Sequence, residues 1–382
     1  MKLVFVSNYR NHHQIPLCNA FLELCDEFVF IATDTQNIQG YQNIAKADYV
    51  VEYRDDSRNS VNGIIENADV VIFGSCPNHL IANRMRNNKL SFLYSERFYK
   101  KALWRALNPR SRKKLINRIG QYRNANMFVL CASAFLPLDL WLLRFPTEKC
   151  YRWGYFPEYT ELVTDEFKSK QVNSIVWVGR LLDWKHPDMA LKAALYLKSK
   201  GYKFVLNMIG DGPMMPDLKK FILNYGLEEY VHLRGSCSHE DVHKYMVSSE
   251  IFIFTSDKME GWGAVLNEAM GCACAPICSH LIGAVPFLIT DEHNGLIYPQ
   301  GDQEVLNTKI ESLIINRDLR MQYGENAYQT ILTSWNANIA AHRFVKLSQS
   351  LLNGTEVNDY KDGPCSSAIF LDERWIYKKK GV

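Results

Sequence analysis

The 382-residue chain has no apolar run that approaches the roughly 20 residues a membrane-spanning helix needs. Its ten cysteines form no pair of Cys-x-x-Cys motifs at zinc-finger spacing, and many of them, such as Cys131 and Cys272, lie within apolar segments. We therefore expect buried, reduced thiols and no metal site. Residues 1–7 are too short for a signal peptide and predict a first strand, so a cytoplasmic protein is expected. The net charge of +3 by itself identifies no class of partner.

The composition, with 47% apolar and 22% charged residues, is that of a globular protein, and the length favours two domains. Short apolar runs alternate with helix-length segments, which predicts an α/β protein with mostly parallel sheets and crossover helices. The expected strands of the first half are 2–7, 28–32, 49–53, 69–74, 90–94 and 127–131. An irregular, charged stretch, 158–173, precedes a second series that begins at Ser174. We predict domains over 1–165 and 166–345, followed by a C-terminal helix end and tail, 346–382.

The most informative stretch is 252–271, where an apolar strand is followed by a glycine-broken loop and a helix-forming run. Gly261 and Gly263 permit close backbone approach. The first free N–H groups of the expected helix, near Ala264 and Val265, would point at an anion. This geometry suits a diphosphate.

Two carboxylates flank the same loop. Glu260 precedes the expected helix and Glu268 lies two turns inside it. Carboxylates are poor phosphate ligands but good acceptors for sugar hydroxyls, so the pocket suits a nucleotide sugar. The alternative is an ordinary strand-to-helix turn that carries two exposed glutamates.

Residues 260–270 read Glu-Gly-Trp-Gly-Ala-Val-Leu-Asn-Glu-Ala-Met. This run resembles the E-x7-E signature of retaining glycosyltransferases of family four, and the resemblance extends in order over most of 174–345. It implies a GT-B fold, in which two Rossmann-like domains face each other across a cleft. It also implies that Glu260 holds the transferred sugar and Glu268 the ribose, with Trp262 among the donor-site residues.

Further landmarks of that family follow in the second half. Gly179-Arg180 with Lys185 resembles the Gly-Arg...Lys element whose cations hold the donor diphosphate. Two cations can offset the charge of a leaving nucleoside diphosphate without a metal. The resemblance also places Gly210 near the nucleotide and Arg234 and Gly235 near its base.

One landmark departs from the family pattern. Ala284 and Phe287 stand in the loop where the family commonly has Gly-Gly-x-Pro-Glu, so this loop lacks the acid that contacts the donor sugar. Further along, Asp302 is predicted to cap a helix.

In the first half, polar loops follow the expected strands. His12 and His13 come after the first strand, where the family usually has a glycine-rich loop, and His13 is a candidate base for the acceptor hydroxyl. The alternative is a polar loop that caps the next helix. His79 follows the fourth strand. Glu96 and Arg97 follow the fifth, where they line the acceptor side or pair with each other at the surface.

The strongest charge bias runs from Arg97 to Arg123, with ten basic residues and no acid. Apolar residues, including Trp104 and Leu107, are interleaved among them. Such a segment can lie at an anionic membrane surface, where each cation adds about 1 kcal/mol of attraction. A solvated helix face is the alternative. No nucleic-acid motif accompanies the segment, so nucleic acid is not an expected partner.

Together these features predict a retaining hexosyltransferase that uses a nucleoside diphosphate sugar, with a UDP-sugar favoured, and needs no metal cofactor. Its expected acceptor is a glycan or lipid-linked glycan in polysaccharide, lipopolysaccharide or glycolipid assembly at the inner face of the membrane. The alternatives are a nucleotide-sugar epimerase or inverting transferase on the same fold, and a non-catalytic subunit that binds nucleotide sugars.

Overall fold

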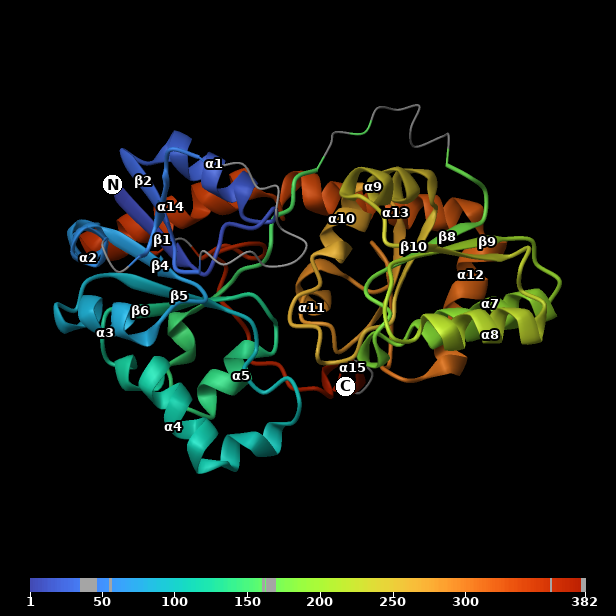
Figure 1. The fold of residues 1–382 in the computed structure, drawn as a ribbon, viewed down its shortest axis with the longest axis horizontal. Coiled ribbons are helices and arrows are strands. Elements are labelled where there is room, and N and C mark those ends of the chain that lie inside the picture. The colour runs from blue at the N-terminus through green and yellow to red at the C-terminus, as the bar shows by residue number, and fades with distance from the viewer. Residues whose placement is uncertain (35–46, 55–56, 160–161, 163–169, 358, 379–382) are drawn as a thin grey trace. The chain divides into compact units, whose positions relative to one another are not determined.

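The structure is a computed structural model, drawn in Figure 1. It describes residues 1–382 except 35–46, 55–56, 160–161, 163–169, 358 and 379–382. The chain forms two compact units. The first comprises Met1–Glu158 and Ser334–Asp372, and the second comprises Tyr159–Thr333 and Glu373–Val382. Each unit is described by itself.

The first unit is built on a seven-stranded parallel sheet with the order β3-β2-β1-β4-β5-β6-β7. Its strands are β1 (Lys2–Ser7), β2 (Glu27–Ala32), β3 (Val50–Glu52), β4 (Val70–Phe73), β5 (Ser91–Ser95), β6 (Met127–Cys131) and β7 (Cys150–Arg152). Its α-helices are α1 (Ile15–Leu24), α2 (Arg58–Asn67), α3 (Asn78–Arg86), α4 (Pro109–Arg118), α5 (Leu136–Trp141) and α14 (Ala337–Asn353). The run Val-Val-Ile-Phe of β4 is buried throughout, as expected for a parallel strand covered on both faces.

The second unit holds a six-stranded parallel sheet with the order β10-β9-β8-β11-β12-β13. Its strands are β8 (Ser174–Val178), β9 (Val205–Ile209), β10 (Val231–Gly235), β11 (Ile251–Phe254), β12 (Ala275–Ser279) and β13 (Leu296–Tyr298). Its α-helices are α7 (Pro187–Ser199), α8 (Met215–Tyr225), α9 (His239–Ser248), α10 (Val265–Gly271), α11 (Val285–Leu288), α12 (Gln303–Ile315), α13 (Arg317–Thr333) and α15 (Trp375–Lys378). The predicted cap of α12 is confirmed, because the Asp302 carboxylate accepts a hydrogen bond from Val305 N at 3.0 Å.

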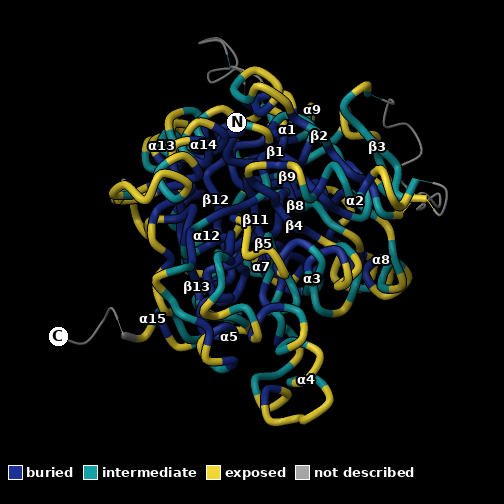
Figure 2. The backbone as a smooth tube through the Cα atoms, turned by 90° about the vertical axis from the view of Figure 1, so that its left-hand side faces the viewer, coloured by how far each residue is buried: buried dark blue, intermediate teal, exposed yellow. Residues whose placement is uncertain are grey.

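In both units the apolar runs form the strands of the core, and Figure 2 shows these strands mostly in the dark blue of buried residues. The predicted α/β class is confirmed. Each expected strand of the first half is present, and its ends agree with the prediction to within one or two residues. Among the described residues, no helix combines the length and apolar character needed to span a bilayer.

The C-terminal part of the chain differs from the prediction. The predicted boundary at 165 and 166 lies outside the described residues, but 334–345 belong to the first unit rather than to the second. The physical reason is Phe344 of α14, whose ring packs 5.5 Å from Phe21, 4.9 Å from Phe92 and 5.8 Å from Trp153, measured between ring centroids. The helix therefore completes the core of the first unit.

The stretch expected to be a tail also extends the first sheet. Strand β7 was not predicted, because only two apolar residues, Cys150 and Tyr151, lie between Lys149 and Arg152 and form no apolar run. Its outer edge pairs with the chain beyond α14: Arg152 N donates to Ser366 O at 2.8 Å, and Ala368 N donates to Cys150 O at 2.9 Å. The segment covers backbone groups that an edge strand otherwise leaves open.

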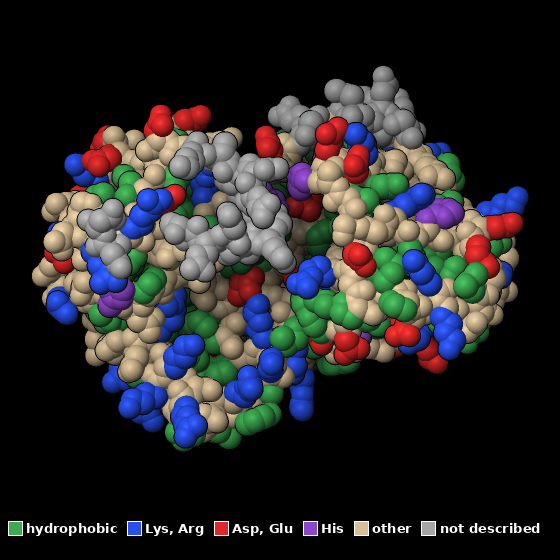
Figure 3. Space-filling view, in the orientation of Figure 1, with side chains coloured by type: hydrophobic (Ala, Val, Ile, Leu, Met, Phe, Trp, Pro, Cys, Tyr) green, Lys and Arg blue, Asp and Glu red, His purple; other side chains and the backbone are tan. Residues whose placement is uncertain are grey.

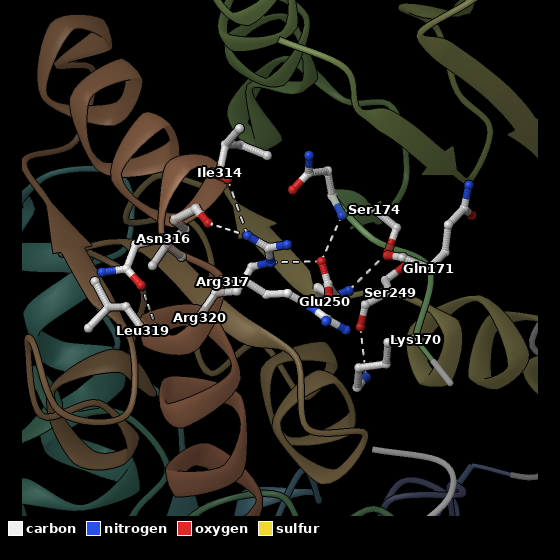
Figure 4. Close-up of polar contacts among 12 residues, drawn as sticks. Lys170, Gln171, Ser174, Ser249, Glu250, Ile314, Asn316, Arg317, Leu319 and Arg320 are labelled. Atoms are coloured by element: carbon white, nitrogen blue, oxygen red, sulfur yellow. Dashed lines mark hydrogen bonds and ion pairs between the residues drawn. The ribbon is translucent and has the colours of Figure 1, made fainter. Parts of the chain in front are cut away.

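A buried ion pair fixes the strand that leads to the candidate site (Figure 4). Glu250 directly precedes β11 and is 1% exposed, and its Oε2 lies 2.7 Å from Arg320 Nε on α13. Arg320 Nη1 also donates to Leu313 O at 2.8 Å, and Asn173 N donates to Glu250 Oε2 at 2.7 Å. Each charge is therefore satisfied by several partners, as burial requires.

Lysine supplies a second buried anchor nearby. Lys170 Nζ donates to three backbone carbonyls, those of Val247 at 3.0 Å, Ser249 at 2.7 Å and Cys272 at 2.7 Å. These carbonyls end α9, precede β11 and follow α10. The lysine thus joins the segments on either side of the glycine-broken loop.

Replacement of Arg320 by alanine is expected to lower the free energy of unfolding by about 3–5 kcal/mol, because it leaves the Glu250 carboxylate buried beside a cavity. Urea unfolding of the full chain measures the change. Arg317→Ala is the matched control: this arginine is 53% exposed and lies 3.5 Å from the same carboxylate. Its loss is expected to cost less than about 1 kcal/mol. Equal decreases in the free energy of unfolding of the two variants would show that burial does not determine how much the ion pair contributes to stability.

Candidate functional site

The sheet of the second unit has a topological switch point. Strands β9 and β10 extend to one side of β8, whereas β12 and β13 extend to the other side of β11. Ligands of open α/β sheets bind beyond the carboxyl ends of the strands at such a point. The loops there are 179–186, after β8, and 255–264, after β11, which we call the acid loop. Both were singled out in the sequence.

Bare backbone lines the neighbouring strand ends. Gly179, Gly210 and Gly235 end or follow β8, β9 and β10, and Gly210 N donates to Gly235 O at 2.7 Å. Gly210 has a φ of +133°, and a Cβ built there would lie 1.9 Å from Gly179 O. Only glycine fits, so backbone groups rather than side chains form this edge.

The acid loop folds back over the end of its own strand. Gly263 has a φ of +92°, and a Cβ there would lie 2.6 Å from the ring of Phe254 and 3.2 Å from Glu260 Cγ. Gly261 and Ala264 are buried beside it. Helix α10 begins at Val265, so Glu268 lies in its first turn and not two turns inside it as predicted.

Trp262 has a packing role within this loop. Its indole is completely buried, and its Nε1 donates to Asn267 Oδ1 at 2.9 Å. The family resemblance predicts it among the donor-site residues. Burial turns its side chain into the interior, where it lies 6.2 Å from the ring of Phe287.

The predicted cation and the predicted acid are in direct contact. Lys185 Nζ lies 2.5 Å from Glu260 Oε2, and both side chains are 14% exposed. Ser256 Oγ donates to the same carboxylate oxygen at 3.0 Å. The structure thus brings the two sequence motifs into one cluster.

A hydrogen-bonded chain ties the two loops together behind this pair. Trp177 Nε1 donates to Thr255 Oγ1 at 2.9 Å, and Thr255 Oγ1 donates to Lys185 O at 2.6 Å. Asp257 N donates to Trp184 O at 3.0 Å. Because Trp177 and Thr255 are buried, these bonds hold the loops in register before any ligand arrives.

His186 adds a titratable group to the cluster. It adopts a left-handed conformation with a φ of +48°, and its Nε2 lies 3.8 Å from Asp257 Oδ2. Its pKa is raised, chiefly by the contact with the Asp257 carboxylate and less by the charges of Asp188 and Asp183, while burial opposes this shift. The sequence analysis did not single out this residue, although it directly follows Lys185.

Arg180 is placed differently from Lys185. It follows β8, its side chain is exposed, and no hydrogen bond or ion pair joins its guanidinium group to another residue of the described part of the chain. An unpaired guanidinium beside bare backbone is well placed for a phosphate group.

The remaining predicted donor residues lie at the ends of β10 and α10. Arg234 Nε donates to Asn207 Oδ1 at 2.9 Å, and its guanidinium carbon lies 5.3 Å from the centroid of the Tyr245 ring. Glu268 Oε1 lies 3.7 Å from Nε2 of His239, the first residue of α9. Sequence analysis missed His239, although it lies only four residues beyond Gly235.

In the first unit, three of the predicted acceptor residues form a connected set. The ring centroids of His12 and His13 are 3.7 Å apart, and His13 stacks on Tyr155 at 5.8 Å. The Tyr155 hydroxyl donates to Glu96 Oε1 at 2.7 Å. Glu96 also pairs with Lys100.

His79 is not part of that set. It is exposed at the start of α3, and its Nε2 lies 2.8 Å from the Tyr53 hydroxyl. Arg97 is buried, so the prediction of a pair with Glu96 at the surface is wrong. It is 2% exposed, lies 3.8 Å from Asp139 and stacks over the Phe135 ring at 5.2 Å. Its role is to hold the segment after β5.

The cations of the basic segment 97–123 fall into two groups, those that make contacts within the unit and those that are exposed. Arg112 Nη1 donates to Leu142 O at 2.9 Å, and Arg118 donates to Gly74 O at 2.8 Å, so these cations hold helix α4 on the unit. The exposed cations are Lys101, Arg105, Arg110, Lys113, Lys114 and Arg123. Figure 3 shows lysine and arginine side chains gathered over this part of the first unit. Trp104 and Leu107, on the 3-10 turn Leu103–Leu107, are 66% and 83% exposed.

Comparisons with known proteins agree with this geometry. Residues 160–330 match the model of the family described as glycosyl transferases group 1. An uncharacterised glycosyltransferase of Methanocaldococcus jannaschii is 31% identical over 192 residues, which are 50% of this chain and 48% of the relative. The chain thus spans about half the length of such curated relatives.

A second relative carries a specific name, N-acetylgalactosamine-N,N'-diacetylbacillosaminyl-diphospho-undecaprenol 4-alpha-N-acetylgalactosaminyltransferase, and comes from Campylobacter jejuni. It is 29% identical over 153 residues, 40% of each chain. Among solved structures, Anabaena HepE in complex with UDP superposes with a TM-score of 0.69 at 14% identity, covering 92% of this chain and 100% of HepE. At this identity the likeness shows the fold alone, and the predicted GT-B fold is confirmed.

Proposed function

We propose that the protein transfers a sugar from a nucleoside diphosphate sugar to a glycan or lipid-linked acceptor, because residues 160–330 match the model of the group 1 glycosyltransferase family. The observation that carries the proposal is the Lys185–Glu260 pair at the switch point, 2.5 Å between Nζ and Oε2, with the unpaired Arg180 on the same loop. A UDP-sugar is the favoured donor, which the UDP complex of HepE supports.

In the proposed donor site, Arg180 and Lys185 bind the diphosphate, and the strand-end glycines let it approach the backbone. The two cations offset the charge that develops on the leaving group, so no metal ion is required. Loss of one such contact typically costs about 3–4 kcal/mol of transition-state stabilisation. Glu268 binds the ribose beside His239, and the loop at Arg234 and Gly235 lies next to the base.

We propose that Lys185 changes partners when the donor binds. In the structure it neutralises Glu260, and an arriving diphosphate carries more negative charge than one carboxylate. Transfer of the ammonium group to the diphosphate frees the Glu260 carboxylate to accept hydrogen bonds from hydroxyls of the transferred sugar. Ser256 Oγ, 3.0 Å from the same oxygen, keeps the carboxylate in place.

Transfer with retention follows from attack on the face that the diphosphate leaves. The bond from the anomeric carbon to the diphosphate oxygen breaks, and a bond to the acceptor oxygen forms. The acceptor proton passes to an oxygen of the departing diphosphate. His13 is the alternative base, held in place by the stacked Tyr155 at 5.8 Å.

We assign the acceptor to the first unit. The connected set of His12, His13, Tyr155 and Glu96 offers imidazole, phenol and carboxylate groups that suit sugar hydroxyls. The name of the Campylobacter jejuni relative includes a diphospho-undecaprenol sugar, which supports a lipid-linked acceptor and a role in polysaccharide or glycolipid assembly.

Titration calorimetry with UDP and GDP tests the donor site. Arg180→Ala and Glu268→Ala are each expected to weaken the binding of the preferred nucleotide about tenfold or more, equivalent to roughly 1.4 kcal/mol. Lys219→Ala, which removes another exposed cation of the second unit, is the control and is expected to change nothing.

The same preparations separate the alternatives. Sugar transfer is expected to be lost in Glu260→Ala while nucleotide binding survives, and to be unaffected by a chelator. Epimerisation or inversion with little effect of Glu260→Ala would favour another enzyme of this fold. Nucleotide binding without any turnover in the unmodified protein would favour the non-catalytic subunit. Nucleotide affinities that are unchanged in Arg180→Ala and Glu268→Ala would exclude the proposed donor site.

We further propose that the first unit contacts the inner face of an anionic membrane. The support is the exposed pair of Trp104 and Leu107 among Lys101, Arg105 and Arg110, since apolar side chains flanked by cations suit a lipid interface. Four of the cations that the sequence counted in this segment instead make contacts within the unit: Arg97, Lys100, Arg112 and Arg118.

Sedimentation with vesicles measures this contact. The protein is expected to bind vesicles rich in anionic lipid but not zwitterionic ones. The double change Trp104→Ser and Leu107→Ser is expected to weaken binding about thirtyfold or more, since each of the two side chains loses burial worth roughly 1–3 kcal/mol. Leu223→Ser, at a position 66% exposed on α8, is the control. Unchanged binding in the double variant would leave a solvated helix face as the explanation.

A further inference from the structure

The chain returns to the second unit at its C-terminal end. It enters the first unit at Ser334, where α14 and the pairing of Ser366 with β7 hold it, and it belongs to the second unit again from Glu373. We call the described residues 373–378, which include α15, the return segment (Figure 1).

One end of the return segment contacts the acid loop directly. Glu373 Oε2 lies 3.3 Å from Lys258 Nζ, and the two side chains are 22% and 30% exposed. Lys258 lies two positions before Glu260. This ion pair is therefore made with the loop that carries the proposed sugar-binding carboxylate.

The return segment also encloses His280, which follows β12. Trp375 is 6% exposed, and its Nε1 donates to His280 O at 3.1 Å. Gln300 N donates to His280 Nδ1 at 2.9 Å, so His280 Nε2 carries the proton and donates to Glu373 O at 3.0 Å. Burial lowers the pKa of His280, which favours this neutral form.

The loop that begins at His280 continues the contact to the acid loop. Gly283 N donates to Glu260 O and Ala284 N donates to Trp262 O, both at 3.2 Å. The return segment thus supports Glu260 by two routes, one through Lys258 and one through the backbone of the loop after β12.

A weaker route leads to the other partner of the central ion pair. Gln300 Nε2 lies 3.5 Å from Nε2 of His186, the residue after Lys185. Gln300 is the residue whose backbone N–H orients His280. Contacts of the return segment therefore reach the loops that carry both Lys185 and Glu260.

We propose that the return segment positions the acid loop for the donor, with Glu373 and Trp375 as positioning residues. The buried indole of Trp375 anchors the segment. The Glu373 carboxylate fixes the position of Lys258 and therefore of the backbone that leads to Glu260. A chain that lacks these contacts keeps every donor-site side chain but holds the loop less firmly. The inference rests on the proposed function for its effect on turnover, whereas the ordering of the loop is tested independently of any ligand.

Hydrogen exchange of the full chain tests the ordering. Amides of 255–264 are expected to exchange about tenfold faster in Glu373→Gln, in Trp375→Ala and in a chain ending at Asp372, because the loop then opens without first breaking these contacts. Glu356→Gln, the same change at an exposed position earlier in the C-terminal stretch, is the matched control and is expected to leave exchange unchanged. Unchanged exchange in all three altered chains would overturn the proposal.

A charge exchange separates positioning from a general loss of stability. Glu373→Lys alone is expected to speed exchange in 255–264, and the double variant Lys258→Glu with Glu373→Lys is expected to restore most of the protection. Failure of the double variant to restore any protection, together with faster exchange throughout the second unit, would show a merely structural role.

Kinetics of sugar transfer then connect the loop to function. Glu373→Gln is expected to lower kcat about fivefold with a smaller change in the KM of the donor, as for a group that aligns the reacting centre. If the unmodified protein binds neither UDP nor GDP while loop exchange still responds to the return segment, the proposed function fails and the positioning contact stands. If it binds nucleotide and the loop does not respond, only the positioning contact fails.

Discussion

The ion pair between Lys185 and Glu260 is the interaction on which the candidate site depends. It joins the loop after β8 to the loop after β11 at the point where the strand order reverses. Both residues are mostly buried and lie on loops that are already tied by Trp177 and Thr255. A cation and an acid in such close contact attract each other strongly and hold the two loops together.

The rest of the second unit secures the elements that carry this pair. Glu250 and Arg320 fix the start of β11, and Lys170 joins the ends of the segments around the acid loop. Glycines at 210 and 263 let backbone and ring approach at distances that a Cβ would forbid. The site is therefore a rigid edge of bare backbone with a few charged side chains, which is the arrangement that transition-state stabilisation favours.

Much of this could be predicted from the sequence because the relevant patterns are local. Buried parallel strands are continuous apolar runs, so β1, β6 and β11 were found with their ends. The resemblance to glycosyltransferase motifs located Gly179, Arg180 and Lys185, and the glycine-broken loop after β11 located Glu260. The meeting of Lys185 with Glu260 was not predicted, because the sequence does not show which cation an acid contacts across 75 positions.

The features that were not predicted depend on contacts between residues that are far apart in the sequence. Strand β7 is three residues long and is recognised only by its neighbours, and α14 belongs to the first unit because Phe344 finds Phe21, Phe92 and Trp153 there. Trp262 was placed at the donor site by the family resemblance and Arg97 at the acceptor side by its position after a strand, and the sequence does not show that both side chains are buried. His239 is one polar residue among several at the start of α9, so only its distance to Glu268 distinguishes it.

The central claim is that the Lys185 ammonium group leaves the Glu260 carboxylate and binds the donor diphosphate. The most direct test is the affinity for UDP, which carries the diphosphate but no sugar, of Glu260→Gln and Lys185→Ala. The account predicts that Glu260→Gln binds UDP about threefold or more tightly, because the lysine no longer has to leave a carboxylate, whereas Lys185→Ala weakens binding about tenfold. Equal weakening in both variants would contradict it, since the acid and the cation would then serve the nucleotide together.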